Sequence, residues 1–96
     1  MFLTDNDVLR GVGELAAQGK IRWTVHVEEK MVSRGYDRGQ IKKCLARGYF
    51  TERPTIANTL GPTQYKFRIE ATIDGEKIAV VASLIPDEKV VVITVF

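Results

Sequence analysis

The feature that most constrains the fold is an alternating stretch that returns on itself around Asp74-Gly75. From Gln64 to Ile73 every second side chain is apolar, which is typical of a strand with one buried face. Asp-Gly between two such stretches is a strong signal for a two-residue hairpin turn. Folding the chain there puts both apolar sets on one face. The predicted cross-strand pairs are Tyr65–Leu84, Phe67–Ala82, Ile69–Val80 and Ala71–Ile78.

Two further strands are predicted around this hairpin. Residues 49–53 form a short strand, followed by a loop that contains Pro54 and Gly61-Pro62. After a turn at Pro86-Asp87, residues 89–96 are apolar on both faces, as expected inside a sheet. With a turn of even length, the buried face takes Val91, Ile93 and Val95, and the other face takes Val90, Val92, Thr94 and Phe96.

Three helices are predicted before the first strand, because apolar residues recur there at helical spacing between capping residues and glycines. Residues 20–23 are interpreted as a connector. The expected helices run from Asp5 to Gln18 after Thr4, from Thr24 to Gly35, and from Arg38 to Arg47 between Asp37 and Gly48. The predicted fold is α+β, with three helices on one face of a four-stranded antiparallel sheet. Its predicted core contains Leu9, Val12, Met31, Leu45, Phe67, Ile69, Val80 and Ile93.

Composition supports one soluble globular unit spanning residues 1–96. With 45% hydrophobic and 27% charged residues, the chain has the profile of a folded domain rather than a disordered one. Its apolar stretches are shorter than the roughly 18 residues of a membrane-spanning helix, and its acidic start lacks the pattern of a signal peptide. We therefore expect a cytoplasmic protein without membrane association. Cys44 is the only cysteine, which excludes an internal disulfide and favours a small core residue.

Positive charge is concentrated in the middle of the chain. The net charge is only +2, but residues 20–53 carry nine Lys or Arg against four Asp or Glu. Such a block suggests contact with a polyanion, since phosphate neutralisation supplies most non-specific affinity for nucleic acids. The alternative is a solvated helix surface without a partner.

His26 is the only histidine and lies in the first turn of the second predicted helix. Lys30 and Arg34 follow it at successive intervals of four, so one helical stripe carries a candidate base and two cations. Cleavage of RNA by its own 2′-hydroxyl needs such groups and requires no metal or cofactor. A surface histidine bonded to a carbonyl or water is the alternative. We expect no metal site, because one histidine with scattered carboxylates is a poor ligand set.

The run Trp-Thr-Val-His-Val-Glu-Glu-Lys-Met-Val-Ser-Arg-Gly-Tyr at residues 23–36 resembles a small bacterial family called domain of unknown function 4258. The helix at 41–48 and the Ile-Thr-Val strand at 93–95 extend the resemblance. Members typically have Ala, Arg and Ile where this chain has Val27, Lys30 and Tyr36. The resemblance makes residues 20–96 a family-like core and residues 1–19 a helical extension.

Such domains have been likened to RelE and barnase-type ribonuclease toxins. The resemblance therefore implies a RelE-like two-layer fold and a metal-independent ribonuclease, or a descendant of one, with RNA or the ribosome and an antitoxin-like protein as candidate partners. It implies His26, Arg34 and Thr94 as catalytic residues and Lys30, Lys66 and Arg68 as RNA contacts. The alternatives are a non-catalytic module that binds RNA or protein through the same surface, and a purely structural domain. Catalysis requires His26 and Arg34 to converge with Thr94 or Lys66 within one cleft, whereas a binding module needs only a continuous basic surface. A helix covering the buried sheet face would allow such a cleft only at an edge of the sheet.

Overall fold

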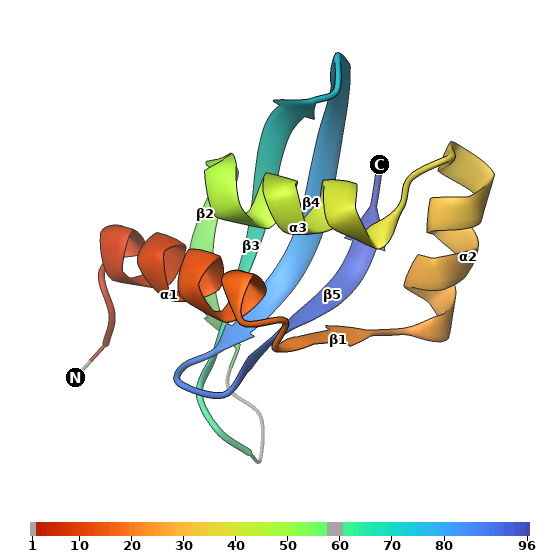
Figure 1. Ribbon diagram of the computed structural model, residues 1–96. Helices are drawn as coiled ribbons and strands as arrows, with labels where there is room; N and C mark the ends of the chain where they lie inside the picture. Colours follow the sequence, from red (N-terminus) through yellow and green to blue (C-terminus); the bar gives the residue numbers. More distant parts are fainter. Residues whose placement is uncertain (1, 58–60) are drawn as a thin grey trace.

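The computed structural model describes residues 2–57 and 61–96 and has helices on one face of a mixed sheet (Figure 1). In that described part, the elements are α1 (Asp5–Ala17), β1 (Ile21–Trp23), α2 (Val25–Arg34), α3 (Arg38–Arg47), β2 (Tyr49–Ala57), β3 (Gln64–Ile73), β4 (Glu76–Ile85) and β5 (Lys89–Val95). The strand order is β1-β5-β4-β3-β2. Helices α1 and α3 lie across the sheet, whereas α2 lies at its side next to β5 (Figure 1). None of the helices within the described ranges is both long and apolar enough to span a membrane.

The predicted helices are confirmed, and their ends follow from local chemistry. Thr4 and Asp37 each accept a hydrogen bond from the backbone N–H three residues later, and both helix starts form complete capping boxes. Thr24 caps α2 by accepting from the N–H of Val27 at 3.2 Å. Gly35 ends α2 with φ 73°, in the left-handed region that favours glycine.

The predicted hairpin is confirmed with its full register. Asp74 and Gly75 have φ values of 52° and 80°, as a two-residue turn of this type requires. All four predicted cross-strand pairs are present, and the side chains of Phe67 and Ile69 are buried against the helices. This hairpin forms the centre of the sheet.

The expected four-stranded antiparallel sheet is wrong, because the described residues form a five-stranded mixed sheet. The predicted connector at 20–23 contains β1, which pairs in parallel with β5 from Ile21–Val90 to Trp23–Val92. Three residues are too few to show strand alternation in the sequence. The parallel pairing nevertheless satisfies backbone groups of β5, as the 3.0 Å bond from the Val90 N–H to the Lys20 carbonyl shows.

The strand β2 is also longer than the predicted 49–53 segment and continues through Pro54 to Ala57, so the start of the predicted loop is wrong. Residues 58–60 of that predicted loop lie outside the described residues. Proline is tolerated there because β2 is an edge strand, and its pairing with β3 is irregular on both sides of Glu52.

The predicted faces of β5 are wrong in its first half and correct at its end. The β4–β5 pairing joins Ile85 to Lys89, so the turn holds three residues rather than an even number. Val90 and Val92 are therefore fully buried, whereas Ile93 is 36% exposed. A bulge at Ile93 then restores the expected phase, since the pairing passes from Ala82–Val92 to Val81–Thr94. Thr94 consequently lies on the face opposite the core.

The core lies between α1, α3 and the sheet, with α2 closing one side. Six of the predicted core residues are buried, Leu9 is partly buried against them, and Ile93 is the error.

Cys44 is buried among these core residues, and burial raises the pKa of its thiol to about 11. Gly48, which follows the last residue of α3, is packed closely against α3 and β3, because an added Cβ would lie 2.6 Å from the Cys44 carbonyl oxygen.

Candidate functional site

The position of α2 determines which of its side chains reach the sheet. Strand β1 ends opposite Val92, and Thr24 immediately starts α2, which then packs beside the remainder of β5 (Figure 1). Val27 and Met31 point into the core. The neighbouring stripe of α2, which carries His26 and Lys30, is left at the boundary between the helix and the solvent-facing side of β5.

His26 meets Thr94 at this boundary. The two side chains approach with 3.4 Å between His26 Nε2 and Thr94 Oγ1. His26 is exposed and Thr94 is half-buried, so solutes can reach the pair from outside. The bulge at Ile93 makes the meeting feasible, because it turns Thr94 away from the core. The edge location anticipated from the sequence is therefore where these two residues converge.

Two of the predicted RNA contacts, Lys30 and Arg68, lie beside the aromatic ring of Phe96. The Lys30 ammonium nitrogen lies 5.5 Å from the centre of the Phe96 ring, and the Arg68 guanidinium carbon lies 5.0 Å from it. Lys30 comes from α2 and Arg68 from β3, so helix and sheet contribute one cation each. Phe96 follows Thr94 by two residues on the same face of the sheet, which places both cations on the side of the His26–Thr94 pair.

Glu70, which is also on β3, forms an ion pair with Arg68. Its carboxylate lies 3.7 Å from Arg68 Nε and 3.3 Å from Lys77 Nζ, and its side chain is only 10% exposed. A hydrogen bond from the Thr51 side chain, with further contributions from Lys77 and Arg68, holds the pKa of Glu70 below its usual value. The carboxylate therefore remains ionised and attracts the Arg68 guanidinium.

Arg34 and Lys66 are not joined to this cluster. Arg34 is the exposed last residue of α2, and within residues 2–57 and 61–96 no hydrogen bond or ion pair links it to His26 or Thr94. Lys66 lies on the same face of β3 as Arg68 and borders a separate hollow of about 280 Å³ near Glu52. The structure therefore brings together His26 with Thr94 and Lys30 with Arg68.

The sequence interpretation missed the roles of Phe96 and Glu70. The alternation of residues 64–73 puts Glu70 on the same face as Arg68, and Phe96 was predicted to share a face with Thr94. The signal in the sequence was therefore an aromatic ring and a carboxylate on the face that carries the cations. Their contacts depend on where α2 packs, which no local pattern indicates. Among the residues that the structure describes, there is no group of three His, Cys, Asp or Glu arranged to hold a metal ion.

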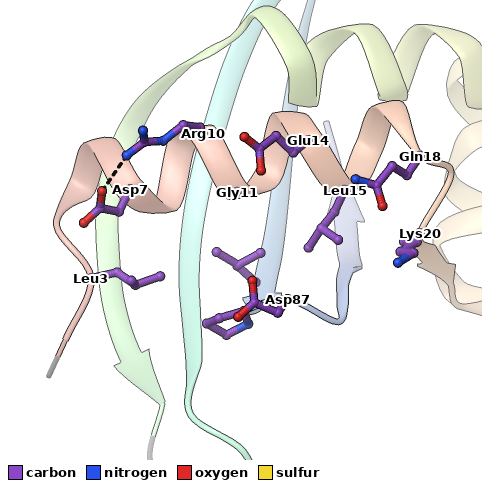
Figure 2. Close-up of a pocket in the computed structure, with 11 residues that line it drawn as sticks. Leu3, Asp7, Arg10, Gly11, Glu14, Leu15, Gln18, Lys20 and Asp87 are labelled. Atoms are coloured by element: carbon purple, nitrogen blue, oxygen red, sulfur yellow. Dashed lines mark hydrogen bonds and ion pairs between the residues drawn. The ribbon is translucent and has the colours of Figure 1, made fainter.

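A second hollow, of about 430 Å³, lies between α1 and the β4–β5 turn (Figure 2). Figure 2 shows Asp7 and Arg10 paired at its rim, at 2.7 Å, with Asp87 on the opposite wall. Neither His26 nor either cation beside Phe96 lines this hollow. It is therefore distinct from the candidate site, which we define as His26, Thr94, Phe96, Lys30 and Arg68.

A protein-family model described as Domain of unknown function (DUF4258) matches residues 23–96. This match covers more than half of the chain, so the chain belongs to that family. It includes every residue of the candidate site and leaves out α1. No curated protein and no solved structure is significantly similar to the chain.

Proposed function

We propose that this member of the DUF4258 family is a metal-independent, RelE-like ribonuclease of the cytoplasm. The observation that carries the proposal is the 3.4 Å approach of His26 Nε2 to Thr94 Oγ1 on an exposed surface beside two cations. Cleavage by an internal 2′-hydroxyl requires a base that the substrate hydroxyl can reach and positive charge near the phosphate. His26 is exposed at a point where it already contacts one hydroxyl, and the two cations lie on the same side of the sheet.

In the proposed reaction, His26 Nε2 accepts the proton of a ribose 2′-hydroxyl. The 2′-oxygen bonds to the adjacent phosphorus while the bond from phosphorus to the 5′-oxygen breaks. The leaving oxygen takes a proton from water, and the hydroxide that this forms removes the proton held by His26. The products are therefore a 2′,3′-cyclic phosphate and a 5′-hydroxyl end, with His26 returned to its starting state. At 3.4 Å the contact with Thr94 is long for a hydrogen bond, which allows the substrate hydroxyl to replace Thr94 at Nε2.

In the proposed reaction, Lys30 and Arg68 stabilise negative charge on the phosphate. Negative charge grows on the phosphate oxygens as the new bond forms, and nearby cations stabilise that charge. Lys66 lies two residues from Arg68 on the same face of β3 and extends the positive surface along the sheet. We propose that single-stranded RNA, free or within the ribosome, follows this surface.

The test is cleavage of a synthetic single-stranded RNA by the purified protein in EDTA, with detection of the 2′,3′-cyclic phosphate. A matched strand with 2′-deoxyribose at every position should remain intact, because it lacks the attacking hydroxyl. Equal cleavage of both strands would contradict the proposed chemistry. Binding of RNA without cleavage would favour the non-catalytic module instead.

A further inference from the structure

We infer that Phe96 is a positioning residue whose ring holds Lys30 and Arg68 together as one phosphate-binding pair. This inference rests on the proposed function, since it assumes that a phosphate chain is the ligand. It adds the expectation that this part of the site recognises phosphates and not bases.

The Phe96 backbone is held in place from two sides. Its N–H donates to the Ala79 carbonyl at 2.8 Å, and its carbonyl accepts from the Ala79 N–H at 3.3 Å. The Tyr36 hydroxyl donates to the same Phe96 carbonyl at 3.2 Å and so links the segment after α2 to the end of the sheet. The ring therefore projects from a constrained position.

Lys30 and Arg68 reach the same ring from different parts of the chain. They come from different elements, their side chains are long and flexible, and their like charges repel. The face of an aromatic ring attracts cations, and both cationic groups lie within 5.5 Å of the Phe96 ring centre. A single ring thus attracts both cations to one part of the surface.

The charge of this pair is only partly compensated by carboxylates. Among the described residues Lys30 forms no ion pair, and the Nε of Arg68 lies 3.7 Å from Glu70 without a hydrogen-bond partner. The aromatic ring attracts the cations without carrying a formal charge of its own. The pair therefore retains a net positive charge for an anion, and phosphate oxygens match both ammonium and guanidinium donors.

The experiment compares binding of two probes, a mixed-sequence single-stranded RNA and inorganic polyphosphate, which contains no bases. Phe96→Leu should weaken binding of both probes by roughly five- to twentyfold, the scale expected for two cation–ring contacts of half-buried cationic side chains. Phe96→Tyr, which keeps the ring, should bind like the wild type. Thermal melting of each variant shows whether the fold is kept.

A double-mutant cycle separates positioning from a merely structural role. In a protein that already carries Lys30→Ala and Arg68→Ala, Phe96→Leu should have no further effect on either probe. The inference is overturned if Phe96→Leu binds polyphosphate as the wild type does, if the loss is confined to RNA, as stacking on a base would give, or if the loss persists in the doubly substituted protein. A wild type that shows the predicted polyphosphate pattern but never cleaves RNA would refute the proposed reaction and leave this inference standing.

Discussion

His26 Nε2 lies 3.4 Å from Thr94 Oγ1, although 68 positions separate the two residues in the chain. Their meeting depends on two irregularities in the chain, each of which shifts the in-and-out alternation of the β5 side chains by one residue. The three-residue turn reverses the expected phase of the strand, and the bulge at Ile93 reverses it again. The local irregularity of β5 is therefore part of the candidate site.

Thr94 can be tested with a substitution that keeps its shape. Once the substrate 2′-hydroxyl has replaced Thr94 at His26 Nε2, we expect the Thr94 hydroxyl to hydrogen-bond that substrate hydroxyl. Thr94→Val replaces the Thr94 hydroxyl with a methyl group, and we expect RNA cleavage to fall roughly tenfold, the effect of about one lost hydrogen bond to a polar or charged partner. Thr94→Ser retains the hydroxyl and should cleave at close to the wild-type rate. Equal rates for the valine variant and the wild type would show that the hydroxyl has no role.

The salt dependence of RNA binding should report the cations of the site. Each phosphate neutralised on a single strand contributes about −0.7 to the slope of log affinity against log salt concentration. Lys30→Ala, Arg68→Ala and Lys66→Ala should each reduce the slope by about that amount. Lys43→Ala is the matched control, because Lys43 lies on α3 across the opposite face of the sheet. Unchanged slopes for Lys30→Ala, Arg68→Ala and Lys66→Ala would argue against this binding surface, as would an equal reduction for Lys43→Ala.

Glu70 should make folding stability depend on pH in the acid range. Its pKa in the folded protein lies below the ordinary value of 4.5, so the stabilisation that it gives is present above that value and is lost as the pH falls through the lower, folded pKa. Urea unfolding of Glu70→Gln between about pH 7 and about pH 3 should therefore show a smaller loss of stability on acidification than the wild type. Parallel pH curves for the two proteins would contradict the assignment.

Gly48 should be intolerant of any side chain. An added Cβ would lie 2.6 Å from the Cys44 carbonyl oxygen and 2.8 Å from that of Glu70, and neither backbone can move without disturbing α3 or β3. Gly48→Ala should lower the free energy of unfolding by about 2–3 kcal/mol in urea titrations. Gly13→Ala is the control, because Gly13 lies within α1 and an added Cβ there would meet the Ala46 carbonyl oxygen only at an ordinary contact distance of 4.0 Å. This substitution should be neutral or slightly stabilising.

The parts of the fold that were predictable are those determined by neighbours in sequence. Capping residues at Thr4, Thr24 and Asp37 mark the helix starts, and Asp74-Gly75 sets the register of the central hairpin. The strand β1 was missed because its pairing partner lies far along the chain and three residues carry no periodic pattern. The faces of β5 depend on the length of a turn whose backbone conformation the residues Pro86-Asp87 do not determine.

The candidate site, too, was predictable only where its arrangement depends on residues close together in the sequence. The spacing of His26 and Lys30 on one helical stripe was visible in the sequence, because helical periodicity is local. The contact with Thr94 and the gathering of Lys30 and Arg68 around Phe96 require α2 to pack beside β5. The position of β1 determines that packing, and β1 was the strand missing from the predicted sheet.

The most direct test is RNA cleavage in EDTA by the wild type, by His26→Ala and by Ser33→Ala, an exposed control on the same helix. We expect the wild type to form 2′,3′-cyclic phosphate ends and His26→Ala to slow their formation roughly 10²- to 10³-fold, the scale for losing a general base. The melting temperatures of the three proteins should agree, and Ser33→Ala should cleave like the wild type. A wild type that leaves varied RNAs and ribosomes intact, or a His26→Ala variant that cleaves at the wild-type rate, would contradict the proposed reaction.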